Sequence, residues 1–312
     1  MTDSAPPVYR GRLAPTPSGY LHLGHASTFW TAFQRARERN GVLLFRNEDL
    51  DPDRCRPEFA VAAIEDLRWL GIDWQEGPDV GGPHAPYTQS QRLDHFRRTW
   101  FQLHAAGAIY PSPHSRKDVQ DALVAPHDDR SYKSELTGAM ATAASGHAPA
   151  QRDSPDGEPV FPVQLRPPQG AGEDAREPGE VNWRFRVPDG EIIAFIDLRI
   201  GRVERTAGRD FGDFVVWRKD SFPSYELAVV GDDHAMEITE VVRGDDLLTS
   251  TCRQLLIYRA LGWKPPAFYH CPLVIDAGGN RLAKRNDALS LRMLRKRGST
   301  AEQIRAHLLI EP

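Results

Sequence analysis

Residues 12–25 read RLAPTPSGYLHLGH, and this stretch decides the fold expected for the chain. The preceding residues 8–14 have the pattern of a strand, and residues 15–19 are rich in turn formers. Apolar side chains then recur at helical spacing through residues 23–40. A strand, a tight turn and a helix in this order predict the edge of an open α/β sheet, where ligands bind at strand carboxyl ends beside helix N-termini.

The segments that follow continue this alternation of strand and helix. Residues 42–45 are a short apolar run, typical of a strand buried on both faces. Residues 57–70 predict a helix with proline in its first turn, and residues 90–106 predict an amphipathic helix. Further strands are expected at 192–196, 214–217, 225–230, 238–243 and 270–275, and a further helix at 249–261. We therefore predict an α/β protein with a parallel sheet and helical crossovers.

The composition changes in the middle of the chain. Residues 139–180 contain seven prolines, five glycines and eight alanines, which favours a loop or a partly disordered insertion. We accordingly expect the nucleotide-binding sheet to be split by an insertion. The expected segments are residues 1–106 for the first half, 107–190 for the insertion subdomain, 191–287 for the second half and 288–312 for a short basic tail.

Charge and composition limit the classes of function. The net charge of −4 argues against a protein that simply coats nucleic acid. A basic cluster at residues 281–305 suits either a solvated helix or a local RNA contact. No apolar run approaches the roughly 20 residues of a membrane helix, and the N-terminus has no apolar signal segment. The three cysteines have no metal-site spacing. We expect a cytoplasmic protein without membrane contact.

Two histidines lie where the first predicted helix begins. His22 and His25 are three residues apart, so they share one face of the first helical turn. Gly24 has no side chain, so a base or a phosphate can approach the backbone. A bare HxGH pattern is more often a pair of surface histidines. Here the strand–turn–helix setting favours a polyphosphate site, to which both imidazoles could donate hydrogen bonds.

Four blocks of sequence, in order, resemble the glutamyl-tRNA synthetases of class I. They are residues 12–25, which end in the HIGH-type signature; 45–54, FRNEDLDPDR; 225–234, YELAVVGDDH; and 238–246, ITEVVRGDD. Four ordered blocks are far more specific than any one of them. The resemblance implies the Rossmann-type parallel sheet of class I synthetases, split by an insertion subdomain.

The same resemblance implies a site for each substrate. ATP would be bound by His22, Gly24, His25 and Lys284, with His22, His25 and Lys284 as catalytic residues. Glutamate would be held by Arg12, Ala14, Thr16, Glu48, Tyr225 and Arg243. The chemistry suits this ligand, because guanidinium forks bind carboxylates and a carboxylate can pair with an ammonium. Taken singly, Glu48 or Arg243 would more often be part of a structural ion pair.

Residues 278–285, GGNRLAKR, resemble the KMSKS-type loop of class I synthetases. Lys284 would neutralise charge on the ATP phosphates as the bond to pyrophosphate breaks. The family usually has serine where this chain has Ala283, so we expect slower activation rather than none. The implied reaction is in-line attack of the glutamate α-carboxylate on the α-phosphate of ATP, assisted by Mg²⁺. No protein nucleophile is required.

The short C-terminal part bears on the acceptor. Only 25 residues follow Asp287, where full glutamyl-tRNA synthetases continue into an anticodon-binding region. This pattern resembles the glutamyl-queuosine tRNA(Asp) synthetases, which activate glutamate without tRNA and attach it to the queuosine base of tRNA(Asp). We expect a monomer with glutamate and queuosine-containing tRNA(Asp) as partners.

Other functions are compatible with parts of this pattern. A minimal glutamyl-tRNA synthetase acting on tRNA(Glu) and a non-catalytic tRNA-binding paralogue both stay open. A generic Rossmann dehydrogenase fails, because no GxGxxG follows the first strand. The queuosine subfamily often has a zinc site that opens with C-x-C, where this chain has Ser112 and His114. A site so poor in thiolates is a weak zinc cage, so we expect no zinc.

Overall fold

The computed structural model describes residues 8–124, 157, 159–274 and 290–308. Its strands are β1 (Arg10–Leu13), β2 (Val42–Phe45), β3 (Ile109–Ser112), β4 (Asn182–Phe185), β5 (Ile192–Asp197), β6 (Gly201–Thr206), β7 (Phe214–Trp217), β8 (Glu240–Gly244) and β9 (Ala267–Cys271). Its α-helices are α1 (Leu23–Glu38), α2 (Pro57–Trp69), α3 (Leu93–Ala105), α4 (Arg116–Val124), α5 (Tyr225–Ala235), α6 (Leu248–Leu261), α7 (Leu291–Lys296) and α8 (Ala301–Leu308). Short 3-10 helices are η1 (Gln89–Arg92), η2 (Val163–Leu165) and η3 (Asp245–Leu247).

Two of the sheets together form the layer that carries the site. β1 and β2 pair in parallel, and a four-stranded sheet has the order β6-β5-β9-β8. In that sheet β9 is parallel to both neighbours, and β6 is the antiparallel edge. β1 lies beside β8, because the Thr239 backbone N–H donates to the Arg10 carbonyl and the Arg10 N–H donates to the Thr239 hydroxyl. The predicted α/β architecture is confirmed.

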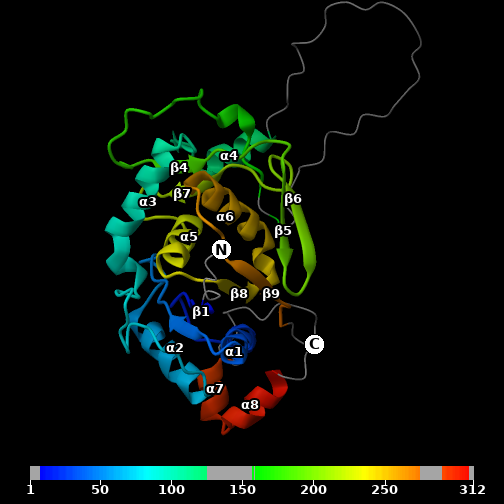
Figure 1. Ribbon diagram of the computed structural model, residues 1–312. Coiled ribbons are helices and arrows are strands. Elements are labelled where there is room, and N and C mark those ends of the chain that lie inside the picture. The colour runs from blue at the N-terminus through cyan, green and yellow to red at the C-terminus, as the bar shows by residue number, and fades with distance from the viewer. Residues whose placement is uncertain (1–7, 125–156, 158, 275–289, 309–312) are drawn as a thin grey trace, which may run out of the picture.

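The third sheet contains strands from the predicted insertion. β3, β4 and β7 form an antiparallel sheet, in which β4 pairs with β3 on one side and with β7 on the other. Figure 1 shows this sheet and α4 at one end of the molecule and α2, α7 and α8 at the opposite end. Since β7 lies beyond residue 190, the sheet crosses the expected boundary of the insertion. The division of the chain into four segments therefore stays a prediction.

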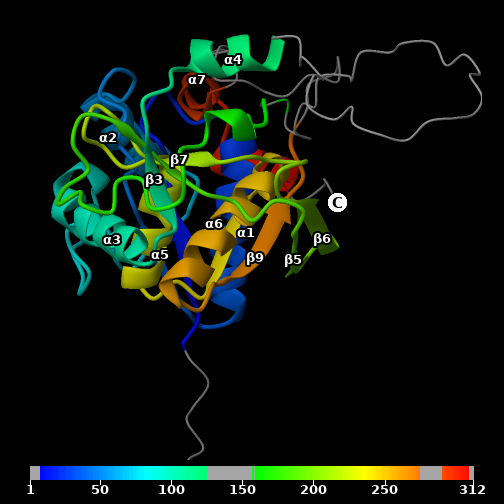
Figure 2. The ribbon, with the colours of Figure 1, turned by 90° about the horizontal axis from the view of Figure 1, so that it is seen from above.

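The helices cover this framework on both sides of the layer. One apolar core includes Phe96 and Trp100 of α3, Leu227 of α5, Leu256 of α6 and Trp183 of β4. In Figure 2, as in Figure 1, α6 lies between α3 and the β5–β6 hairpin. A second core joins α1, β1, β2 and α2 to the C-terminal helices. Among the described residues, no helix combines the length and the apolar character that crossing a membrane requires.

The helix α1 forms where its spacing predicts it. Its buried residues recur at helical intervals and face the second core, namely Ala26, Phe29, Ala32, Phe33 and Ala36. At its start, the His22 side chain accepts the Gly24 N–H and so caps the helix. It ends two residues before Asn40, which takes a left-handed conformation with φ 47°.

The strand expected at residues 225–230 is wrong, because these residues begin helix α5. Ser224 is its N-cap, and the Ser224 hydroxyl accepts a hydrogen bond from the Leu227 N–H. Every residue from Glu226 to Asp233 is buried, so the helix shows no polar face. A short run without periodicity cannot be told from a buried strand by its sequence pattern.

Some of the C-terminal basic residues contact the rest of the protein. Arg292 pairs with Glu65 at 2.5 Å, and the Arg305 guanidinium donates to the Leu70 carbonyl at 3.1 Å. Their side chains are 28% and 27% exposed. The guanidinium of Arg295 lies over the ring of Trp69. In the described part of this segment, Arg292 and Arg305 are therefore partly buried, whereas Arg295, Lys296 and Arg297 are exposed. Both interpretations of the basic cluster stay predictions.

Replacing Ser224 by alanine should destabilise the protein by about 1 kcal/mol, because α5 would lose its capping acceptor. Ser224→Asn keeps an acceptor at the cap and should stay close to the wild type. Urea unfolding of the three proteins measures the difference. Equal stability of the alanine and asparagine variants would show that the cap contributes nothing.

Candidate active site

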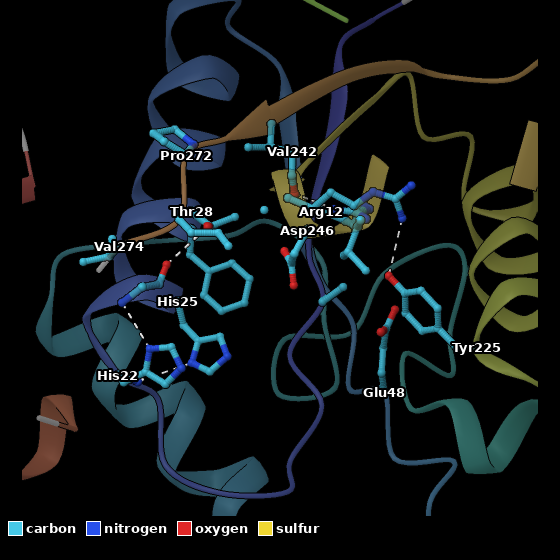
Figure 3. A pocket seen from close by; sticks show the side chains of 17 residues that line it. Arg12, His22, His25, Thr28, Glu48, Tyr225, Val242, Asp246, Pro272 and Val274 are labelled. Atoms are coloured by element: carbon cyan, nitrogen blue, oxygen red, sulfur yellow. Dashed lines mark hydrogen bonds between the residues drawn. The ribbon is translucent and has the colours of Figure 1, made fainter. Parts of the chain in front are cut away.

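A cavity of about 180 Å³ opens at the carboxyl ends of β1, β2, β8 and β9, beside the start of α1. This is where an open α/β sheet binds its ligands. The side chains around it point inward from all of these elements (Figure 3). The lining residues are Arg12, Ala14, His22, Gly24, His25, Thr28, Phe29, Glu48, Tyr225, Val242, Arg243, Gly244, Asp246, Leu247, Pro272, Leu273 and Val274.

The two predicted histidines lie together at one end of the cavity. Their rings are 3.8 Å apart between centroids, and Figure 3 shows them side by side. The Gly24 N–H donates to His22 Nδ1 at 3.1 Å, and the His22 N–H donates to His25 Nδ1 at 3.3 Å. Because both Nδ1 atoms accept, each neutral ring carries its proton on Nε2. The backbone thus fixes the two imidazoles as Nε2–H donors.

Gly24 matters for the position of the first ring. A Cβ atom at residue 24 would lie 3.0 Å from Cε1 and 3.1 Å from Nδ1 of His22. These separations are shorter than ordinary carbon contacts, so any side chain here would push the His22 ring away. A side chain at residue 24 would therefore require the His22 ring to shift by a few tenths of an ångström.

At the other end, Glu48 is held by a buried arginine. Arg46 is fully buried, and its guanidinium donates to Glu48 Oε1 at 2.9 Å and to Asp233 Oδ1 at 2.7 Å. Glu48 Oε2 has no hydrogen-bond partner among the described residues. Burial raises the pKa of Glu48, and the charges of Arg46 and Arg12 only partly oppose this shift. The Glu48 carboxylate would therefore stabilise a cationic group of a ligand in the cavity.

Arg12 lies near the end of β1, beside Asp233, the carboxylate that also accepts from Arg46. Its Nη1 donates to the Val242 carbonyl at 3.0 Å, which ties β1 to β8. Its Nε lies 3.5 Å from Asp233 Oδ1. Asp233 is thus shared between two arginines, Arg12 and Arg46, so its charge does not neutralise Arg12 alone.

Arg243 is buried, with 4% of its surface exposed, and all its hydrogen-bond partners are neutral groups. Its Nη2 donates to the Thr251 hydroxyl at 2.7 Å and to Gln254 Oε1 at 2.9 Å. Its Nη1 points to the Tyr225 hydroxyl at 3.4 Å, and its Nε donates to His270 Nε2 at 3.3 Å. Within the described residues, no carboxylate lies within 4.0 Å of this guanidinium. The buried Glu226 interacts with its charge from further away, through Gln254, which donates to Glu226 Oε2 at 2.8 Å.

His270 is neutral at ordinary pH. Burial and the nearby Arg243 charge lower the pKa of His270 to about 4, although a hydrogen bond to Asp197 opposes the shift. The ring is fully buried. A neutral imidazole is therefore the acceptor for the Arg243 Nε–H.

Most of the sequence-predicted residues meet in this cavity. Arg12, Ala14, Glu48, Tyr225 and Arg243 line one end, and His22, Gly24 and His25 line the other. Thr16 does not line it. Lys284 and Ala283 lie outside the described residues. The roles assigned to these residues stay predictions.

Several lining residues were not singled out from the sequence. Asp246 lies between the two ends of the cavity in Figure 3, and Thr28 lies one turn along α1 from the histidines. Asp246 belongs to the fourth sequence block, so its carboxylate could have been chosen on that ground. Pro272, Leu273 and Val274 follow β9 and have no motif that would identify them.

No group of three or more metal-ligating side chains is arranged to hold an ion among the described residues. Ser112, one of the two positions expected to replace zinc ligands, is buried and accepts a hydrogen bond from Arg184 Nε at 3.3 Å. His114 lines a second cavity of about 860 Å³. Tyr225 lines both cavities.

The chain belongs to the family described as tRNA synthetases class I (E and Q), catalytic domain, whose model matches residues 9–310. It is a ligase of the aminoacyl-tRNA synthetase type. It is 42% identical over 301 residues to a protein of Nitratidesulfovibrio vulgaris and 44% identical over 298 residues to one of Symbiobacterium thermophilum, both named glutamyl-Q tRNA(Asp) synthetase. These alignments cover 96% of this chain and 85% and 84% of the two relatives.

Longer relatives and a solved structure share the same fold. A glutamate–tRNA ligase of Myxococcus xanthus is 36% identical over 98% of this chain, which spans 58% of that protein. The crystal structure of a glutamate tRNA ligase from Elizabethkingia meningosepticum, in complex with its amino acid, superposes with a TM-score of 0.69 at 28% identity. The match covers 94% of this chain and 54% of that one, so this chain spans about half of the length of the solved ligase.

The buried histidine makes stability depend on pH. Because the pKa of His270 is about 4 in the fold and about 6.5 when unfolded, the unfolded chain takes up a proton that the native ring does not. His270 therefore costs stability as the pH falls from 6.5 to 4, by about 3 kcal/mol in all. His270→Gln should remove this part of the loss. Urea unfolding of both proteins across this range tests it, and parallel pH profiles would contradict it.

Proposed function

We propose that this enzyme activates glutamate with ATP, forms glutamyl-adenylate without tRNA, and transfers the glutamate to the queuosine base of tRNA(Asp). The observation that carries the first part is the buried Arg243 guanidinium, whose partners are all neutral, facing a carboxylate in the same cavity. A small cavity that contains the Arg243 guanidinium and the Glu48 carboxylate, not paired with each other, suits an amino acid with an acidic side chain. The names of the two relatives that match over 85% and 84% of their length support the acceptor.

In this proposal, Arg243 and Arg12 bind the carboxylates of glutamate and Glu48 Oε2 binds its ammonium. Tyr225 forms the wall beside the side chain, and Ala14 leaves room at the end of β1. Thr16, predicted to contact glutamate, would have to do so from outside the lined cavity. The α-carboxylate would then face the histidine end, where the ATP phosphates bind.

The histidines would act on the phosphates. His22 and His25 donate from Nε2 to oxygens on which charge develops when the α-carboxylate oxygen attacks the α-phosphorus and the bond to pyrophosphate breaks. Gly24 lets the nucleotide approach the start of α1. Mg²⁺ would be carried by the phosphates themselves, because the described residues offer no cluster of acidic ligands. When bound, this ion would neutralise phosphate charge. Lys284 is predicted to act in the same step.

ATP–pyrophosphate exchange tests the proposal. Glutamate should support exchange without tRNA, and the other nineteen amino acids should not. Labelled glutamate should then pass to tRNA(Asp) that contains queuosine and not to tRNA(Asp) without it. Transfer to tRNA(Glu) instead would make the chain a minimal glutamyl-tRNA synthetase. Absence of exchange with every amino acid would favour a non-catalytic paralogue.

Gly24→Ala should raise the KM for ATP by about tenfold, because the added methyl group displaces the His22 ring and a small misplacement of a positioning group has large effects. The KM for glutamate should stay within about twofold, since the other end of the cavity is untouched. Ser27→Ala, a substitution in the same helix at a residue that does not line the cavity, is the control. Steady-state exchange kinetics measure both constants. An unchanged KM for ATP would remove the requirement for glycine.

A further inference from the structure

One acidic and one basic side chain behind the cavity have no part in the proposed function. Asp197 ends β5 and His270 lies on the neighbouring strand β9, and they are 2% and 0% exposed. Neither lines the cavity. Both belong to a chain of contacts that ends at Arg243.

The Asp197 carboxylate is saturated by N–H donors. Its Oδ1 accepts the Arg199 and Ile200 N–H groups, each at 2.9 Å. Its Oδ2 accepts the His270 backbone N–H at 3.0 Å and lies 2.7 Å from His270 Nδ1. These donors hold the pKa of Asp197 below its usual range, although burial alone would raise it. A carboxylate that accepts from Nδ1 fixes the proton of the neutral ring on that nitrogen.

The opposite ring nitrogen must then be an acceptor. His270 Nε2 lies 3.3 Å from Arg243 Nε and 2.9 Å from the Thr251 hydroxyl. Thr251 and Gln254 of α6 hold the Arg243 Nη2. The guanidinium is therefore fixed along one edge by His270, Thr251 and Gln254, and its Nη1, near the Tyr225 hydroxyl, is on the opposite edge.

The choice of a neutral ring has an electrostatic consequence. A carboxylate at the position of His270 would orient Arg243 equally well, but it would neutralise the charge that a substrate carboxylate needs. The imidazole supplies an acceptor without a charge. The negative charge that fixes the tautomer of His270 is on Asp197. His270 lies between Asp197 and Arg243, and the Asp197 carboxylate accepts hydrogen bonds from four N–H donors.

We propose that Asp197 and His270 form a positioning pair, in which Asp197 sets the tautomer of His270 and His270 orients an un-neutralised Arg243 toward the carboxylate of the amino acid. This inference rests on the proposed function and adds to it two residues that set amino-acid affinity without touching the substrate.

Three variants separate the elements of the pair. Asp197→Asn must turn its NH₂ toward one of the two donor pairs. In the orientation facing His270 it moves the ring proton to Nε2, against the Arg243 N–H. His270→Asn keeps a group at the position of Nδ1 but has none at Nε2. His270→Gln keeps an amide that can accept at the position of Nε2. His104→Gln, on α3 and outside the cavity, is the matched control.

The expected result is a split between the two substrates. His270→Asn should raise the KM for glutamate in ATP–pyrophosphate exchange by about tenfold or more, the effect of losing a hydrogen bond to a charged group. Asp197→Asn should do the same if its histidine spectrum shows the His270 proton on Nε2. The KM for ATP should stay within about twofold in both. His270→Gln should restore most of the glutamate affinity, and His104→Gln should behave like the wild type. Nitrogen-15 histidine spectra should show His270 protonated on Nδ1 in the wild type.

The outcomes distinguish this inference from the function beneath it. If the wild type shows no glutamate-dependent exchange, the proposed function and this inference both fall. If it does, but Asp197→Asn and His270→Asn keep its KM for glutamate, only the positioning pair is overturned. Equal increases in both KM values, or a spectrum with His270 protonated on Nε2 in the wild type, would also overturn it. A selective rise reversed in His270→Gln would support it.

Discussion

The buried Arg46 guanidinium is the interaction on which the rest of the site depends. It is fully buried and is surrounded by three carboxylates, those of Glu48, Asp232 and Asp233. Burial by itself would lower the pKa of Arg46, but these negative charges raise it. Removing one partner of such a group leaves the others buried and unpaired, at a cost of about 3–5 kcal/mol. The segment after β2 is therefore locked to α5, two elements far apart in sequence.

This constraint explains why one cavity can combine both halves of the sheet. The first half supplies Arg12 and Glu48, and the second supplies Tyr225 and Arg243. Arg46 joins the halves on one side of the cavity, and the bond from Arg12 to the Val242 carbonyl joins them directly across β1 and β8. β3 and β4, the described strands of the predicted insertion, pair with β7 in a separate sheet and not with β1 or β8.

Sequence reasoning succeeded where local pattern and structure coincide. β2 and β7 have the predicted bounds, and α1 begins at the predicted residue, because their apolar spacing is unambiguous. It failed at α5, a helix whose residues 226–233 are all buried, and it gave no bounds for β3 and β4, which lie beside a segment rich in proline, glycine and alanine. Most predicted site residues do line one cavity. His270 and Asp197 could not be found this way, since their importance comes from contacts across strands and α6, and no local spacing records such contacts.

The neutral surroundings of Arg243 also bear on selectivity. Under the proposed function, an amide in place of the substrate carboxylate would fill nearly the same volume, so shape alone would hardly reject glutamine. It would, however, leave a desolvated guanidinium without an anion. A site built around a buried polar group discriminates strongly against an isostere that fails to satisfy it, whereas a merely apolar pocket does not. Fidelity would then be achieved at the first encounter with the amino acid, with no need for a second site that destroys wrong products.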